Sequence, residues 1–266
     1  MPWRGFECPI NGRHVVLEDC VACPFPCLEL PFLASMWGDG PREPRPERYS
    51  VTSFTKPTQA IVLETINDYW SDPFSMVRMT IGSAFHSVME DSRLFLAGFN
   101  RKDKDFEFEK KFEHPIVVDD IPATLVGKSD QYQFSTRTLT DYKGAGTYSY
   151  EKAVRGDFSG YDVQVNFYRK YQYPFAETMQ LAFWLTDHSK RQWIKGIRPF
   201  ERVTVPFIPD DVLERLMVEK VRAIRAGLAD PGSVAPCSSE ERWDGNRCER
   251  WCNAAPFCRQ YKKKGD

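Results

Sequence analysis

The chain of 266 residues has no cysteine between Cys27 and Cys237, no surplus of charge of one sign and no long apolar run. Its 36 Lys and Arg residues are balanced by 37 Asp and Glu, and the net charge of −1 indicates no partner by itself. Because no apolar run approaches the roughly 18 residues that cross a bilayer, we expect no membrane partner. Residues 1–5 also lack the apolar stretch of a signal peptide, so we expect a cytoplasmic protein.

The composition is that of a folded globular protein. Hydrophobic residues make up 42% of the chain and charged residues 27%, which excludes a collagen-like or mainly disordered chain. The length suits one large domain with appendages and is sufficient to bury a core.

The eight cysteines lie in two groups of four at the two ends of the sequence, Cys8, Cys20, Cys23 and Cys27 in one group and Cys237, Cys248, Cys252 and Cys258 in the other. In a reducing compartment such groups are metal sites more often than disulfides. Four thiolates are the ligand set of a closed tetrahedral site. We predict Zn²⁺ at the N-terminal group, because a C-x2-C pair in a small polar segment is typical of a zinc ribbon. Soft thiolates at the C-terminal group accept either zinc or an iron–sulfur cluster.

Four segments are predicted along the chain: a Cys-rich zinc-ribbon-like segment (1–37), a Pro/Gly linker (38–48), a core domain (49–232) and a Cys cluster with a basic tail (233–266). Hydrophobic periodicity in the core predicts helices over 58–69, 79–95 and 210–228. Alternation predicts strands over 106–109, 116–118, 123–126 continuing through 131–134, and 139–142, with a turn at 135–138. Helix-like spacing also extends over 163–184, interrupted by Pro174, and 193–207 is predicted to be a strand region.

Two carboxylates and a lysine stand on the predicted hairpin. Asp141 and Lys143 are two residues apart in one strand, so both side chains point to the same face. If the strands pair, Asp130 of the preceding strand can lie beside Asp141. Carboxylate oxygens hold Mg²⁺ or Mn²⁺, which activates water and neutralises charge on a phosphate, while a lysine stabilises the transition state. Because the D-x-K pattern alone is common, the alternative is that the two acids and the lysine are surface residues of a solvated hairpin.

Other polar residues accompany the hairpin in a definite order. Before it, Gly82 and His86 lie on a predicted helix, where the histidine is a possible metal ligand and the glycine would allow close backbone approach. Glu90, one turn later, is either an acidic support or an exposed glutamate. After the hairpin, Gln164 and Tyr168 are four residues apart and share one helical face.

This order of motifs, Gly-x3-His, Gly-x2-Asp, Asp-x-Lys, Gln-x3-Tyr and a terminal Cys triplet, resembles the RecB-type nucleases of the PD-(D/E)xK superfamily. It is most similar to the CRISPR-associated RecB-like exonucleases and related phage enzymes, from about Ser50 to the C-terminus. The resemblance implies an α/β restriction-endonuclease-like core, a mixed central sheet flanked by helices, with Cys-rich metal-binding segments at both ends.

The resemblance also implies residue roles. His86, Asp130, Asp141 and the backbone carbonyl of Tyr142 would bind Mg²⁺ or Mn²⁺, and Lys143 would be the catalytic lysine. Gln164 and Tyr168 would contact DNA and brace the site. In the family, three C-terminal cysteines join one upstream cysteine to hold a [4Fe–4S] cluster, but residues 51–57 contain none. Either Cys237 or an N-terminal cysteine would replace it.

These features predict a metal-dependent DNA nuclease, an exonuclease on single strands or DNA ends in recombination, repair or CRISPR or phage DNA processing, with a possible protein partner in such a complex. Two alternatives remain: a non-catalytic metal-stapled nucleic-acid or protein-binding module, and a structure-specific endonuclease on the same fold. DNA contacts would be local, from basic and aromatic residues that otherwise form a solvated face and a core: Arg101, Lys102, Lys110, Lys111, Arg169, Lys170, Arg198, Arg202, Lys262 to Lys264, Tyr171, Tyr173 and Trp184.

Overall fold

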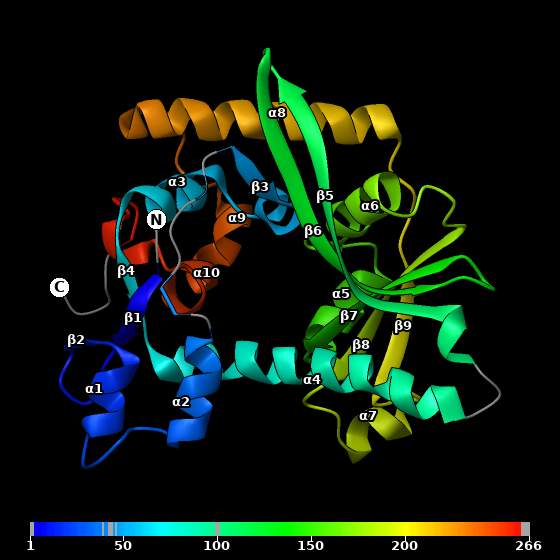
Figure 1. Cartoon of the computed structure of the whole chain (residues 1–266), viewed down its shortest axis with the longest axis horizontal. Helices are drawn as coiled ribbons and strands as arrows, with labels where there is room; N and C mark the ends of the chain where they lie inside the picture. Colours follow the sequence, from blue (N-terminus) through cyan, green and yellow to red (C-terminus); the bar gives the residue numbers. More distant parts are fainter. Residues whose placement is uncertain (1–2, 39, 42–44, 46, 99–101, 262–266) are drawn as a thin grey trace. The chain divides into compact units, whose positions relative to one another are not determined.

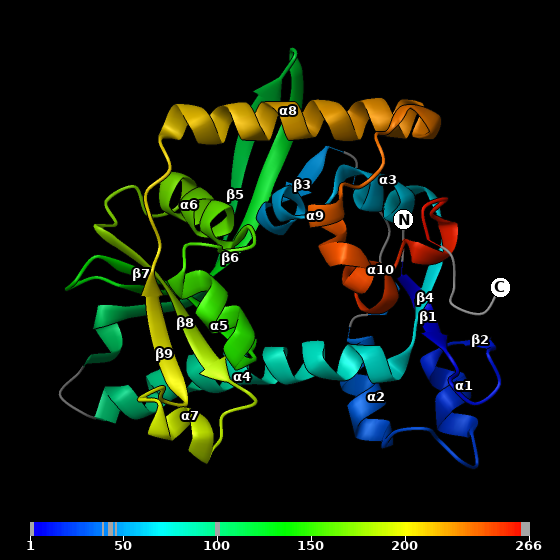
Figure 2. The same cartoon turned by 180° about the vertical axis from the view of Figure 1, so that it is seen from behind.

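The computed structural model describes residues 3–38, 40–41, 45, 47–98 and 102–261. The chain divides into two compact units (Figures 1 and 2). The first unit comprises Met1–Pro46, Lys56–Thr80 and Glu219–Asp266, and the second comprises Glu47–Thr55 and Ile81–Val218. Both cysteine groups therefore belong to the first unit, and the residues of the other four predicted nuclease motifs belong to the second.

The first unit contains a small three-stranded sheet in the order β2-β1-β4. Strand β1 (Trp3–Glu7) pairs antiparallel with β2 (His14–Val15) and parallel with β4 (Tyr69–Ser71). Helices α1 (Leu17–Ala22), α2 (Leu30–Trp37) and α3 (Thr58–Ile66) belong to the same unit. One core cluster of four buried side chains, Phe6, Leu33, Met36 and Met76, joins the sheet to α2 and to the start of α4 (Pro73–Gly98).

The C-terminal part of the first unit consists of short helical turns. They are η3 (Pro231–Ser233), α9 (Ser239–Arg242), η4 (Trp243–Gly245), α10 (Asn246–Arg250) and η5 (Ala255–Phe257). Helix α9 begins with a capping box, in which Ser238 and Glu241 satisfy each other's backbone N–H groups. Segments this short bury little apolar surface of their own, so the chain here needs another source of stability.

The second unit is built on a six-stranded mixed sheet in the order β3-β6-β7-β8-β9, with β5 beside β6. The strands are β3 (Arg48–Ser50), β5 (Phe106–Val118), β6 (Ile121–Gln133), β7 (Thr138–Ala145), β8 (Thr178–Leu185) and β9 (Phe200–Thr204). Strands β5 and β6, β6 and β7, and β8 and β9 pair antiparallel, whereas β3–β6 and β7–β8 are parallel.

Helices flank both faces of this sheet. On one face, Phe85 of α4 packs against Tyr142 of β7 and Ala182 of β8. Alternation along β7 turns Asp141 and Lys143 to the other face, toward α6 (Tyr161–Tyr171). The remaining elements are α5 (Thr147–Val154), α7 (Lys190–Ile194), α8 (Asp210–Ala229), η1 (Val51–Thr55) and η2 (Lys102–Asp105).

The predicted fold class, a mixed central sheet flanked by helices, is confirmed. The predicted helices over 58–69, 79–95 and 210–228 correspond to α3, α4 and α8, and the predicted hairpin is β6–β7. No described helix is long and apolar enough to cross a membrane. Several residues of the predicted linker, 39, 42–44 and 46, lie outside the described residues.

Two predictions of secondary structure are wrong in part. Helical spacing over 163–184 gives way after Tyr171, because Pro174 ends the helix and 178–185 forms β8 between β7 and β9. A strand that is buried on both faces presents a continuous apolar run, which periodicity does not separate from a helix. In the predicted strand region 193–207, the strand is β9, whereas Trp193 and Ile194 belong to α7.

Candidate active site

The two aspartates meet where the β6–β7 ladder opens. The ladder pairs Gln131 with Thr140 and Gln133 with Thr138, so the next position of the register sets Asp130 beside Asp141. There the carboxylate of Asp130 replaces the main-chain acceptor, and its Oδ2 accepts the N–H of Tyr142 at 2.6 Å. Both aspartates are buried. The predicted convergence of these two residues is therefore present.

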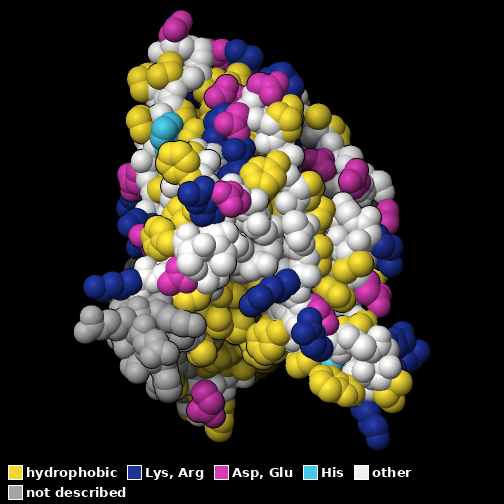
Figure 3. All heavy atoms as spheres, turned by 90° about the vertical axis from the view of Figure 1, so that its right-hand side faces the viewer, with side chains coloured by type: hydrophobic (Ala, Val, Ile, Leu, Met, Phe, Trp, Pro, Cys, Tyr) yellow, Lys and Arg dark blue, Asp and Glu magenta, His cyan; other side chains and the backbone are white. Residues whose placement is uncertain are grey.

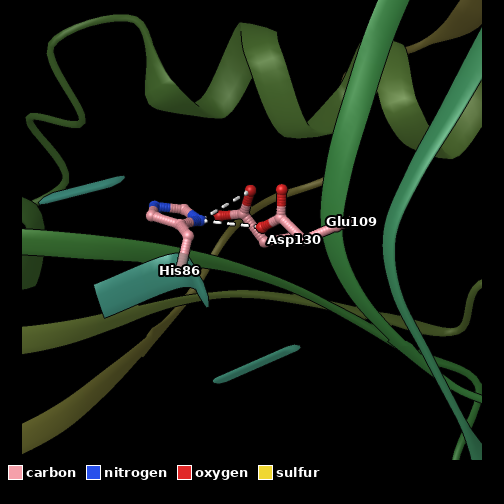
Figure 4. A group of neighbouring side chains, drawn as sticks. All are labelled: His86, Glu109 and Asp130. Carbon is pink, nitrogen blue, oxygen red and sulfur yellow. Dashed lines mark hydrogen bonds and ion pairs between the residues drawn. The ribbon is translucent and has the colours of Figure 1, made fainter. Parts of the chain in front are cut away.

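His86 reaches this opening from α4. Its Nδ1 lies 3.0 Å from Glu109 Oε1 and 3.4 Å from Asp130 Oδ1 (Figure 4). Contact with Asp130, and then with Glu109, raises the pKa of His86 to about 10 although burial opposes the shift. Within the described residues, candidate ligand atoms of His86, Glu109 and Asp130 lie within 4.8 Å of one another. One imidazole nitrogen and two carboxylates are a suitable donor set for a divalent ion such as Mn²⁺.

Glu109 is the functional candidate that sequence reasoning missed. It faces Asp130 across the β5–β6 ladder, and its φ of +51° places a non-glycine residue in the left-handed region in the middle of a strand. This conformation costs about 1–2 kcal/mol. Regular alternation would have put Glu109 on the same face as Glu107, which instead accepts the hydroxyl of Tyr173. The backbone strain thus accompanies a carboxylate that faces His86.

A signal for Glu109 was present in the sequence. Asp119 and Asp120 form a two-residue turn with φ values of +54° and +60°, which joins β5 to β6. Counting back from this turn, with Val118 opposite Ile121, brings residue 109 opposite Asp130. Pairing the predicted strands over 116–118 and 123–126 as a hairpin therefore identifies Glu109 from the sequence.

Asp141, which is buried, forms an ion pair with Lys143, which is partly buried. Lys143 Nζ lies 2.7 Å from Asp141 Oδ2 and 4.4 Å from the centre of the Tyr161 ring. Gln164 donates to Asp141 Oδ1 at 3.3 Å. Burial raises the pKa of Asp141 to about 6, and Lys143 limits the rise. Asp141 in turn raises the pKa of Lys143 against the effect of burial, so each residue favours the charged form of the other.

Gln164 and Tyr168 lie one helical turn apart on α6, as predicted, and both are buried. Gln164 Nε2 lies 3.1 Å from the hydroxyl of Tyr168, so the two side chains brace each other behind Asp141. Burial raises the pKa of Tyr168 and keeps the phenol neutral. A Cβ at Gly127 would lie 2.8 Å from the Tyr168 ring, which explains a glycine at this position. At Gly82 a Cβ would meet no described atom within 4 Å, so the close backbone approach expected there stays a prediction.

A cavity of about 760 Å³ collects these side chains in the second unit. Its walls include all six predicted side chains of the nuclease motifs, two glutamates and three basic residues: His86, Asp130, Asp141, Lys143, Gln164, Tyr168, Glu90, Glu109, Arg48, Lys111 and Lys128. The side chain of Tyr142 packs against Phe85 instead. A larger cavity of about 950 Å³ lies in the first unit, and of the motif residues its walls include Cys248 and Cys252 of the terminal Cys triplet.

Several predicted contacts with DNA are engaged within the fold. Arg169 and Lys170 form ion pairs with Asp210 and Glu214 and are largely buried. Tyr173 stacks on Tyr132, and Trp184 packs against Phe85, so these aromatic rings belong to the core. Arg101, the side chain of Lys102 and the tail 262–264 lie outside the described residues.

The four C-terminal cysteines line one small apolar cavity of about 20 Å³, together with Ala60 and Leu63. Burial, followed by Glu241 and the other three thiols, raises the pKa of Cys237 to about 11. All eight cysteines are free thiols. Four thiols around one cavity fit a thiolate-bound metal or cluster in donor chemistry. Among the described residues, however, no three of these sulfurs lie within 4.8 Å of one another.

The N-terminal cysteines are also neighbours. Cys8 follows β1, Cys20 lies in α1, and Cys23 is the C-cap of that helix. Burial, and then Cys27, Cys8 and Cys23, raises the pKa of Cys20. Four thiols are a suitable ligand set for Zn²⁺. With Zn–S bonds of about 2.3 Å, a tetrahedral ion would bring the sulfurs to about 3.8 Å from one another.

No protein-family model matches the chain, and no curated protein matches it in sequence. Among solved structures, it is similar to the crystal structure of SSO0001, with a TM-score of 0.54 and 12% identity over 84% of this chain and 90% of that one. A phage related exonuclease from Haemophilus somnus 129PT is also found, with a TM-score of 0.33 and 18% identity over 54% of this chain and 69% of that one. The first likeness concerns the fold over most of the chain, and neither assigns an activity.

Proposed function

We propose that this chain is a Mg²⁺- or Mn²⁺-dependent deoxyribonuclease, an exonuclease on single-stranded DNA or DNA ends in recombination, repair or CRISPR or phage DNA processing. One observation carries the proposal. His86, Asp130 and the Asp141–Lys143 pair come from three separate elements and line a single cavity, in the order in which the family motifs occur.

The bound ion would supply an activated water and neutralise charge on the scissile phosphate. His86, Asp130 and Glu109 offer its ligands in this arrangement, and Asp141 and the carbonyl of Tyr142 remain further candidates. Lys143 is held at one position by Asp141 and Tyr161, so its ammonium is pre-oriented toward developing negative charge. Gln164 holds the second oxygen of Asp141. The site is thus organised before substrate enters.

Arg48, Lys111 and Lys128 on the cavity wall are the basic groups that would meet the DNA backbone. The face in Figure 3 carries Lys and Arg side chains interspersed with Asp and Glu. This suits a nuclease that binds DNA in one groove rather than one that coats a duplex.

The two cysteine groups complete the proposal as structural sites. The C-terminal group would hold an iron–sulfur cluster or Zn²⁺, with Cys237 as the fourth ligand beside Cys248, Cys252 and Cys258. Cys8, Cys20, Cys23 and Cys27 would hold Zn²⁺. Metal analysis and absorption spectra of protein purified without oxygen distinguish the two chemistries, because an iron–sulfur cluster absorbs visible light and Zn²⁺ does not.

The test is a cleavage assay on end-labelled linear and circular single-stranded DNA with Mn²⁺, Mg²⁺ or EDTA. Wild type should degrade the linear strand only with metal, and Asp141→Asn and Lys143→Ala should lower the rate by at least about 10²–10³-fold. Asp211→Asn, which removes an exposed carboxylate paired with Arg215 on α8 and outside the cavity walls, is the control with little expected effect.

Other outcomes assign the protein differently. Cleavage of the circle as well would make it an endonuclease on the same fold. No metal-dependent cleavage, with DNA binding unchanged in Lys143→Ala, would make it a metal-stapled binding module. Cleavage retained by Asp141→Asn would exclude the proposed site.

A further inference from the structure

Three cationic side chains of the cavity have no assigned role in the nuclease motifs, and one of them, Lys128, contacts a candidate metal ligand. Lys128 lies on β6 two residues before Asp130, so both residues belong to the same face of the strand. Its ammonium contacts Glu109 Oε2, while His86 Nδ1 lies 3.0 Å from Oε1 of the same carboxylate. The lysine therefore occupies the oxygen that His86 leaves open.

Glu109 is what draws Lys128 toward the site. Lys111 stands directly opposite Lys128 in the β5–β6 ladder, and like charges at opposed positions repel each other. The side chain of Lys128 is also 49% exposed, whereas that of Glu109 is 7% exposed. A half-exposed lysine can turn on its flexible stem while the buried carboxylate stays in place.

Resting on the proposed nuclease function, we propose that Lys128 is the resident counter-ion of the metal site. In the metal-free protein it neutralises Glu109. When Mg²⁺ or Mn²⁺ binds among His86, Glu109 and Asp130, the ion takes over this carboxylate, and Lys128 becomes free to bind the phosphate backbone of the substrate.

Two physical arguments support this exchange. A divalent ion and an ammonium compete for the same carboxylate, and they repel each other at short range in a half-buried site. Once the ammonium of Lys128 has left Glu109, Lys128 and Lys111 stand opposite each other across the ladder without a counter-charge. A nearby anion such as a phosphate then reduces their repulsion. Metal binding and substrate binding are thereby coupled through one side chain.

The first test is Mn²⁺ binding without nucleic acid, followed by the electron paramagnetic resonance signal of the free ion. Lys128→Met should tighten Mn²⁺ binding by about tenfold, since it removes a competing charge. Glu109→Gln should weaken binding by about tenfold or more, since it removes a ligand. Lys111→Met is the matched control: it removes the same charge from the same wall without touching Glu109, and should change binding less than about threefold.

The second test is affinity for a single-stranded oligonucleotide with and without Mn²⁺, in a Lys143→Ala background that prevents cleavage. Adding Mn²⁺ should strengthen DNA binding several-fold when Lys128 is present. In Lys128→Met that gain should shrink, even though the variant binds the metal more tightly. Lys128→Gln and thermal unfolding of each variant separate these effects from misfolding.

Opposite results would overturn the inference. If Lys128→Met weakens Mn²⁺ binding or matches Lys111→Met, Lys128 is not a competing counter-ion. If Glu109→Gln binds Mn²⁺ as wild type does, Glu109 is not a ligand. Both results stand apart from the nuclease proposal, because wild type can cleave DNA when either occurs, and the Mn²⁺ pattern can hold in a protein that does not cleave.

Discussion

The two units of the molecule solve the problem of stability in different ways. The second unit buries the strands of a six-stranded sheet between helices, and Leu181 and Phe183 of β8 are fully covered. The first unit has a three-stranded sheet, a core cluster of four buried side chains and all eight cysteines. A small core supplies only a few kcal/mol, and metal binding is the usual supplement. In our interpretation, thiolate chemistry stabilises one unit and carboxylate chemistry acts in the other.

Breaking one cysteine site gives the largest expected contrast between the units. Cys252→Ser removes one of the four thiols around the C-terminal cavity. Because metal affinity of such sites contributes directly to folding, we expect the first unit to lose more than about 3 kcal/mol of stability. Hydrogen exchange should show loss of protection in α3 and the C-terminal turns, while β6–β8 stay protected. Equal loss of protection in both units would contradict the division of roles.

The pH dependence of the metal-free protein should separate the units next. His86 has a pKa raised from its ordinary 6.5 to about 10 by Asp130 and Glu109. A raised pKa means that the folded state holds the proton more tightly, so this stabilisation is complete below pH 6.5 and is lost as pH rises toward 10. Solvent screening at this partly exposed site leaves about 1–2 kcal/mol.

The first unit has a later window. Burial raises the pKa of Cys237 from 9.0 to about 11, so its contribution is present below pH 9 and is lost as pH rises toward 11. Chemical denaturation in EDTA between pH 6 and 10, monitored separately in each unit, tests this order. His86→Asn should flatten the earlier loss in the second unit. An unchanged slope in that variant would show that His86 is not its source.

The sequence predicted the parts of the site that depend on short-range geometry. Alternation placed Asp141 and Lys143 on one face, the turn at 135–138 brought Asp130 beside Asp141, and helical spacing paired Gln164 with Tyr168. The ends of α3, α4 and α8 differed from the predicted ranges by a few residues, as caps and neighbours adjust helix termini.

The missed parts depend on longer-range packing. Strand β8 gave a helical pattern, because burial between β7 and β9 removes the polar face that marks a strand. Glu109 escaped notice because a left-handed residue inside a strand breaks the alternation on which prediction relies. Its position requires the whole register of β5 against β6. Backbone strain of this kind clusters at functional sites, and here the side chain of the strained residue, Glu109, faces His86.

A second left-handed residue on the same hairpin allows a sharper comparison within the second unit. Asp120, at the β5–β6 turn, has φ of +60°, a conformation that glycine adopts freely. Asp120→Gly creates an Asp-Gly turn of the favoured type and should raise stability by about 0.5 kcal/mol without changing Mn²⁺ binding. Glu109→Gly relieves similar backbone strain but should lose Mn²⁺ affinity. Urea denaturation and Mn²⁺ titration of both variants measure this. If Glu109→Gly binds the ion normally, the strain at position 109 serves the hairpin rather than the site.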